Sequence, residues 1–285
     1  PPVNTRRRAK KMSKNSGTQS FWDHLDVLRS VLIRIIAVSA ACGIVAFIFK
    51  EALFSVALAP KDNDFITYRM LQSLGSIFSA PEGDEFSVQL INTGLAQQFM
   101  IHMKTAMCAG VLCASPYILY EIFRFVSPAL YDNERRYALN VSGAGYVMFM
   151  IGVGVSYYLI FPLTFRFLGT YQVASDVVNM ISLESYMGTL VMMCLAMGVV
   201  FEMPALCWFF AKMGMLNSAF MQTYRKHAIV IILIAAAIIT PTSDVMTLLA
   251  VSFPMWLLYE GSICIVKRID RKRAKAATEQ NLMFS

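Results

Sequence analysis

Long apolar runs without charged residues recur along the chain. A helix needs about 20 mostly apolar residues to cross the roughly 30 Å hydrocarbon layer of a bilayer. The runs are apolar on every side of a helix, whereas a soluble helical bundle would show polar positions every third or fourth residue. They therefore predict membrane spans. The first three runs lie between Arg34 and Lys50, between Lys104 and Glu121, and between Arg136 and Arg166.

Three further runs bring the predicted number of transmembrane helices to six. The fourth, from Glu184 to Lys212, contains one charge, Glu202. The last two are shorter, at 227–243 and 245–259, and would measure only roughly 23 to 26 Å as helices. Helices of that length require local thinning of the bilayer or snorkelling of flanking residues.

Prolines occur inside or at the ends of several predicted spans. Proline removes a backbone donor and bends or ends a helix. We therefore expect an all-α integral membrane protein whose six helices are bent and enclose a concave face. The prolines concerned are Pro116, Pro162, Pro204, Pro241 and Pro254.

The lysines and arginines are distributed unevenly between the two sides of the predicted bundle. Twenty of the 25 fall on the side that holds both termini. The positive-inside rule then places the N-terminus and the C-terminus in the cytoplasm. The net charge of +7 does not indicate nucleic acid, because the cations lie at helix ends and in the tails, where anionic headgroups attract them.

The chain divides into a membrane domain and two basic tails. Residues 1–20 are polar, basic and expected to be disordered. The membrane domain spans 21–267 and includes a large outer loop, 50–98, in which we expect short helices over the bundle. Residues 268–285 form a second basic tail that we expect in the cytoplasm.

No residue pattern indicates a metal, a cofactor or an enzyme active site. The six cysteines lie in apolar runs and the three histidines share no metal-binding spacing. Glu202 is the one carboxylate deep in a predicted span, where a charge costs about 2.5 to 3.5 kcal/mol. We expect it to face a cavity or a partner helix, and we expect Glu121 and Glu260, near helix ends, at the membrane interface.

One long segment resembles the TatC family, the signal-reading subunits of the twin-arginine protein translocase. It runs from Ala114 to Tyr131 (ASPYILYEIFRFVSPALY) and continues as Asp132-Asn133-Glu134-Arg135-Arg136. Four other stretches agree with that family in order and spacing. They are His24-Leu25 with Leu28-Arg29, Phe161-Pro162-Leu163, Phe201-Glu202-Met203-Pro204, and Thr240-Pro241 with Asp244 through Pro254 to Tyr259-Glu260.

The resemblance implies a translocase core subunit in the bacterial inner membrane that is not an enzyme. Such a protein binds twin-arginine signal peptides of folded precursors, recruits single-span TatA-like or TatB-like subunits, associates with itself and uses the proton-motive force. It implies that Glu202 serves a partner helix and that structural roles fall to Pro60, Pro116, Pro128, Pro204, Pro241, Asp244 and Glu260. It assigns signal-peptide binding to Glu134, Arg135, Arg136, Asp26, His24, Leu25, Leu28, Arg29 and Phe125.

Two positions depart from the family pattern. The family usually has Glu where this chain has Val27, next to Asp26, and commonly has Gln where it has Leu248. The first departure affects signal binding directly. From the residues alone, Glu134 and its neighbours are also compatible with a solvated charge cluster, and the buried Glu202 is compatible with a proton-coupled secondary transporter.

Overall fold

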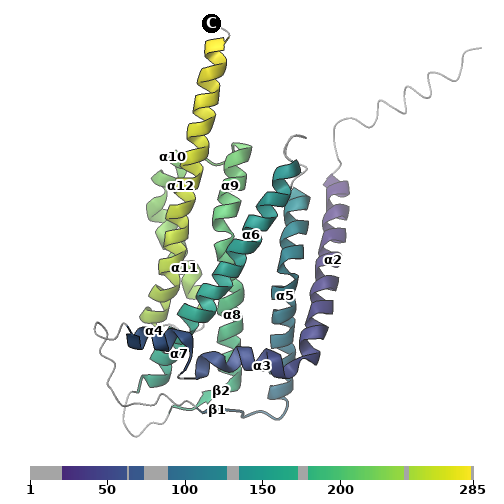
Figure 1. Cartoon of the computed structure of the whole chain (residues 1–285), viewed down its shortest axis with the longest axis vertical. Helices are drawn as coiled ribbons and strands as arrows, with labels where there is room; N and C mark the ends of the chain where they lie inside the picture. The colour runs from purple at the N-terminus through teal and green to yellow at the C-terminus, as the bar shows by residue number, and fades with distance from the viewer. Residues whose placement is uncertain are drawn as a thin grey trace, which may run out of the picture.

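The computed structural model describes residues 21–62, 64–73, 89–126, 135–172, 179–240 and 244–283. The long helices run side by side along the long axis, and most of the short elements gather at one end, whereas the short helix α10 (Ser218–Thr223) lies at the other (Figure 1). The long helices are α2 (Phe21–Ile48), α5 (Gln97–Val126), α6 (Arg135–Val155), α8 (Leu183–Phe201), α9 (Met203–Met213), α11 (Arg225–Ile239) and α12 (Val245–Met283).

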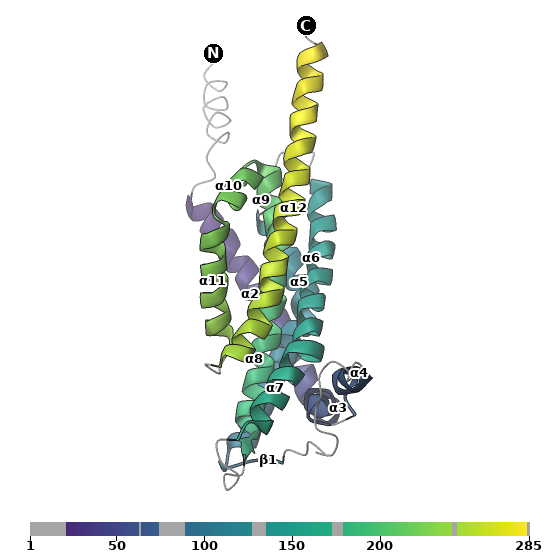
Figure 2. The same ribbon diagram turned by 90° about the vertical axis from the view of Figure 1, so that its left-hand side faces the viewer.

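Within the described residues, five helical segments are long and apolar enough to cross a membrane, in agreement with the expected all-α membrane protein. α11 has 15 residues and is shorter than these five. The six-span count therefore stays a prediction. The beginning of α2 and the end of α12 lie at the same end of the bundle (Figures 1 and 2), and the assignment of that end to the cytoplasm also stays a prediction. The five segments are Leu25–Ile48, Gln97–Phe125, Ser142–Thr170, Leu183–Met213 and Val245–Lys275.

The last helix is much longer than its apolar run predicted. α12 has 39 residues and passes through Glu260 and the boundary placed at 267 and 268 without a break. Glu260 lies inside this helix, and its carboxylate accepts a hydrogen bond of 2.6 Å from Arg225 at the start of α11. Tyr259 also donates to the carbonyl of Met221 in α10 (Ser218–Thr223) at 2.8 Å. The prediction of a short last span was wrong.

The outer loop contains short helices, as expected, within the part of it that the structure describes. They pack against the middle of the chain, where a π-helical turn, η4 (Ser156–Ile160), joins α6 to α7 (Phe161–Thr170). A parallel pair of two-residue strands, β1 (Leu90–Ile91) and β2 (Ile181–Ser182), links the two outer loops. The short helices are α3 (Lys50–Leu58), η1 (Ala59–Lys61) and α4 (Ile66–Ser73).

Side chains satisfy backbone groups that the prolines free. Pro162 cannot donate to the carbonyl of Tyr158 four residues earlier, and the Thr67 hydroxyl of α4 donates to that carbonyl instead. In α5, Pro116 frees the carbonyl of Leu112, which accepts from Ser115 at 2.7 Å. The bent helices therefore keep their hydrogen bonds in a medium without water.

The main core lies around α8 and includes its buried side chains Met193 and Met197, both 0% exposed. Tyr186 packs edge-on against two phenylalanines of α7 and donates to the carbonyl of Ala57 at 3.1 Å. Burial raises the pKa of Tyr68 in α4 to about 12, so its hydroxyl keeps its proton and bonds the carbonyls of Pro60 and Pro162. These contacts fix the outer elements on the bundle.

α2 packs against α5 through their backbones. A Cβ atom added to Gly110 would lie 2.5 Å from the nitrogen of Gly43 and 2.6 Å from the carbonyl oxygen of Ser39. Small residues permit this approach and set where α2 lies along α5. The beginning of α2 is thereby held beside the end of α5.

Candidate functional site

The start of α2 presents several of the predicted binding residues. Leu25 is 38% exposed and Leu28 is 43% exposed, and Asp26 and Arg29 are also exposed. His24 lies in the first turn of the helix. The exposed side chains of Leu25, Asp26, Leu28 and Arg29 are within reach of a ligand at the end of the bundle.

The end of α5 and the beginning of α6 lie at the same end of the molecule (Figure 1). Phe125 is half-buried in the last turn of α5, and Arg135 and Arg136 begin α6. Glu134 and Pro128 lie outside the described residues. The structure thus brings together the helix ends that carry both motifs of the predicted signal site.

A buried carboxylate, Glu121, joins α2 to α5 just inside this end. Its side chain is 3% exposed, and its Oε2 atom accepts from Arg34 of α2 at 3.2 Å. Its Oε1 atom accepts from the Tyr117 hydroxyl at 3.1 Å and lies 3.8 Å from Arg124. Sequence reasoning placed Glu121 at the membrane interface and missed this contact, because the partner cation lies 87 positions earlier in the chain.

We expect Glu121→Ala to lower the free energy of unfolding by about 1 to 3 kcal/mol. Both arginines keep access to water, at 45% and 58% exposed, so the loss should fall below the roughly 3 to 5 kcal/mol of a fully buried pair. A double-mutant cycle with Arg34→Gln, read from detergent unfolding curves, measures the coupling. The control is Lys104→Ala, because its 3.6 Å pair with Glu184 is exposed and should contribute under about 1 kcal/mol. Additive effects at 34 and 121 would contradict the role of the pair.

Position 27 shares one side of α2 with Val31 and Arg34, and the side chain of Val27 is itself 50% exposed. Residues 27, 31 and 34 are four and seven positions apart, so they share one face of the helix. Val31 is buried and Arg34 bonds Glu121 of α5. Asp26 points about 100° away from this face. The exposed acid at 26 therefore lies next to the place of the family glutamate on the helix surface and is offset from it by about 100°.

Glu202 lies at the break between α8 and α9, two residues before Pro204. Its side chain is buried, and neither carboxyl oxygen has a hydrogen-bond partner among the residues that the structure describes. A methyl group at Gly145 of α6 would lie 2.8 Å from Oε2 and 3.2 Å from the ring of Phe123. The carboxyl group therefore lies against the glycine of a neighbouring helix.

The residues expected to have structural roles occupy helix ends and bends. Pro60 is fully buried in η1, Pro116 lies inside α5, and Pro204 lies in the first turn of α9. Asp244 accepts from the backbone nitrogen of Thr247 at 2.6 Å and so caps the start of α12. Pro128 and Pro241 lie outside the described residues.

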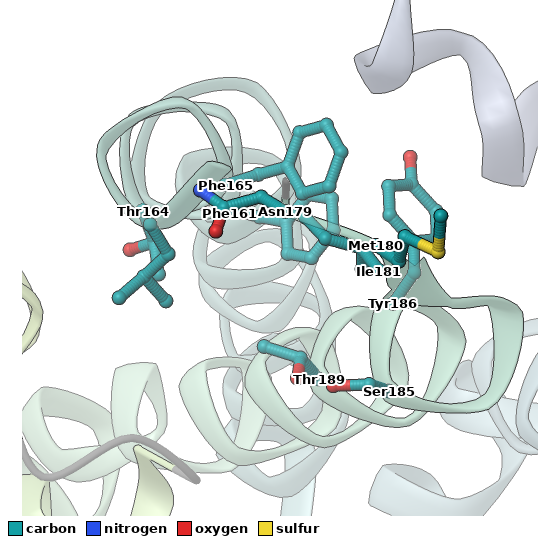
Figure 3. A pocket seen from close by; sticks show the side chains of 10 residues that line it. Phe161, Thr164, Phe165, Asn179, Met180, Ile181, Ser185, Tyr186 and Thr189 are labelled. Atoms are coloured by element: carbon teal, nitrogen blue, oxygen red, sulfur yellow. The ribbon is translucent and has the colours of Figure 1, made fainter. Parts of the chain in front are cut away.

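A pocket of about 220 Å³ lies at the opposite end of the bundle, between α7, β2 and α8 (Figure 3). The rings of Phe161, Phe165 and Tyr186 line it, together with the polar side chains of Thr164 and Ser185. None of the signal-binding residues predicted from the sequence lines this pocket, although Phe161 belongs to one of the stretches that resemble the family. Its position separates it from the end that holds the start of α2.

The chain matches known proteins over most of its length. The family profile described as Sec-independent protein translocase protein (TatC) matches residues 23–254. The Sec-independent protein translocase protein TatC of Blattabacterium sp. subsp. Periplaneta americana is 31% identical over 267 residues, which cover 92% of this chain and 100% of that protein. The protein of the same name from Desulforapulum autotrophicum is 34% identical over 263 residues, covering 92% and 89%.

The fold agrees with the same family. A solved structure described as "Crystal Structure of Twin Arginine Translocase Receptor- TatC" superposes with a TM-score of 0.70 at 30% identity. The match covers 87% of this chain and 99% of that chain.

These similarities decide between the functional classes that the sequence left open. The protein is a component of Sec-independent protein translocation and acts in a complex with other Tat subunits. It is neither an enzyme nor a secondary transporter, and it is a multi-pass protein of the bacterial inner membrane. The chain therefore belongs to the TatC family of Sec-independent protein translocase proteins.

Proposed function

We propose that the chain binds twin-arginine signal peptides at the end of the bundle formed by the start of α2, the end of α5 and the segment that leads into α6. The observation that carries the proposal is the convergence of the two sequence motifs on this end. The Gly43–Gly110 contact and the Arg34–Glu121 pair hold the motif of α2 beside that of α5. Carboxylates suit a guanidinium, since two parallel hydrogen bonds can form.

Glu134 is the acid we assign to the signal arginines. Glu121 is unsuited to that role, because it is buried and already bonded to Arg34 and Tyr117. A photo-crosslinker at position 134 should capture a precursor with an Arg-Arg signal and fail to capture the same precursor with Lys-Lys. Equal capture of both precursors would contradict recognition of the arginines at this site.

Val27→Glu is expected to strengthen precursor binding by about 1.5 to 3 kcal/mol, because it places a second carboxylate on the side of α2 that also carries Val31 and Arg34. Asp26→Asn should weaken binding in the parent and matter little in the Val27→Glu background. Precursor affinity is measured for all four combinations at fixed salt. Additive effects, or no gain from Val27→Glu, would argue against a second acid at this end of α2.

We also propose that Glu202 is the polar contact for a single-span partner subunit in proton-motive-force-driven export. A buried carboxyl group without a hydrogen bond lowers the stability of the fold by about 1 to 3 kcal/mol. Within the described residues, Glu202 is such a group. A polar group of a partner helix would remove that cost. An apolar residue at position 202 could not make this polar contact with a partner helix.

Glu202→Met tests this role, because methionine has a similar length and no hydrogen-bonding groups. The free energy of unfolding should stay equal or rise by about 1 to 3 kcal/mol, while partner copurification and transport fall. Glu202→Gln, which keeps hydrogen bonding, should retain more of both. A Met variant with full transport, or one that loses transport only by unfolding, would contradict the proposal.

A further inference from the structure

A second pocket lies between α9 and α12 and is independent of the proposed signal site. Its volume is about 410 Å³. α9 contributes Trp208 and Lys212, with the ammonium group of Lys212 5.8 Å from the centre of the Trp208 ring. α12 contributes the remaining lining residues. We refer to this space as the α9–α12 pocket.

The α12 side of the pocket is one continuous face of the helix. Ile265, Arg268, Ile269 and Lys272 are separated by three and four positions and line the pocket. Arg273 also lines it and donates a hydrogen bond to the carbonyl of Lys212, which ties the two helices together. Isoleucine side chains of α12 and cationic side chains of both helices therefore line the pocket together.

The positive charge of the pocket is not balanced by acids that line it. Within the described residues, no acidic side chain lines the pocket and neither Arg268 nor Lys272 forms an ion pair. Asp270, the nearest acid on α12, accepts from the backbone nitrogen of Ser218 at 2.8 Å. Cations held this close repel one another unless an anion is bound between them.

The pocket lies where both helices change from apolar to basic residues. The apolar part of α12 ends at Val266, and the apolar stretch of α9 ends near Lys212. Trp208 and Ile265 thus border the hydrocarbon side, and the cations border the headgroup layer. A ligand that fits both parts carries an anionic group and apolar chains.

We propose that the α9–α12 pocket binds an anionic phospholipid, with its headgroup phosphate held by the cations and an acyl chain against Trp208 and the isoleucines. Arginine binds phosphate through paired hydrogen bonds and lysine binds it as a point charge. Basic pockets between membrane helices suit such headgroups. General attraction to a membrane surface would act on basic residues on every face of α12. The proposed site uses only those basic residues of α12 that line the pocket.

Trp208 reports occupancy of the pocket directly. The full chain carrying Trp22→Phe and Trp256→Phe keeps only this tryptophan. It is mixed with detergent micelles that contain brominated phosphatidylglycerol or brominated phosphatidylcholine, whose bromine quenches nearby tryptophan. Half-maximal quenching of Trp208 should need a roughly 25-fold lower fraction of phosphatidylglycerol, at about fivefold for each of two cations.

Matched double variants separate the pocket from general charge. In the double variant Arg268→Gln with Lys272→Gln, the fraction of phosphatidylglycerol needed for half-maximal quenching should come within about threefold of the fraction of phosphatidylcholine. Lys267→Gln with Arg271→Gln removes the same charge from residues of α12 that do not line the pocket and should change the value less than about threefold. Arg268→Lys, which keeps the charge, should retain the preference and confirms that substitution at 268 leaves the fold intact.

Three results would overturn the proposal. The first is equal quenching of Trp208 by the two lipids, and the second is an equal loss in the two double variants. The third is displacement of brominated phosphatidylglycerol by inorganic phosphate but not by chloride at the same ionic strength, which would assign the pocket to a free anion. A chain that keeps only Trp256, which is 39% exposed outside the pocket, should be quenched equally by both lipids.

Discussion

Glu134→Lys is expected to weaken binding of a twin-arginine precursor by at least roughly 10- to 150-fold. Hydrogen bonds to a charged group contribute about 1.5 to 3 kcal/mol, and the lysine adds repulsion between like charges. Glu134→Gln should cost less, because the amide still accepts one hydrogen bond from a guanidinium. Precursor affinity in detergent at fixed salt measures both effects.

Asp132→Lys is the matched control for this result, since it makes the same change of charge two positions earlier in the chain. We expect it to weaken binding only through the general field, which added salt screens. If both lysine variants lose affinity equally, the precursor senses the net charge of this end and Glu134 is not its specific contact.

Gly110→Leu is expected to have the largest effect on the membrane domain itself. Its first side-chain carbon would meet backbone atoms of α2, at 2.5 Å from Gly43 and 2.6 Å from Ser39. Backbone atoms cannot rotate away as side chains do, so the helices must separate. Overpacking usually costs about 1 to 3 kcal/mol, and we expect more than about 3 kcal/mol here.

Two substitutions serve as controls for Gly110→Leu. Gly143→Leu adds the same side chain to a position of α6 where an added Cβ atom meets nothing within 4 Å. Gly43→Ala adds a methyl group at the ordinary contact distances of 3.5 and 3.6 Å. Each should change the free energy of unfolding by under about 1 kcal/mol. A loss of the same size in all three variants would show that the α2–α5 contact does not specifically require glycine at position 110.

Gly110→Leu should also affect precursor binding, because this contact helps to hold the residues at the start of α2 beside α5. A folded remnant that still binds precursor with parental affinity would contradict the view that α2 contributes to the signal site. The comparison uses precursor affinity in the fraction that stays monodisperse, with the Gly143→Leu variant measured in parallel.

The sequence alone determined the class of fold and the family. Backbone groups in lipid must be bonded within one segment, so apolar runs such as the one after Arg136 can only become helices. The prolines indicated where those helices bend, and the segment around Glu134 carried the family motif. These features depend on residues close together in the chain, which is why they can be read from local patterns.

Only the tertiary structure decided which of these residues meet. The buried Glu121 is paired with Arg34 of α2, and the carboxyl group of Glu202 lies against Gly145 of another helix. The length of α12 was missed because charged residues end an apolar run without ending a helix, and lysine and arginine are good helix formers. Contacts of this kind join positions far apart in sequence, and no local periodicity specifies them.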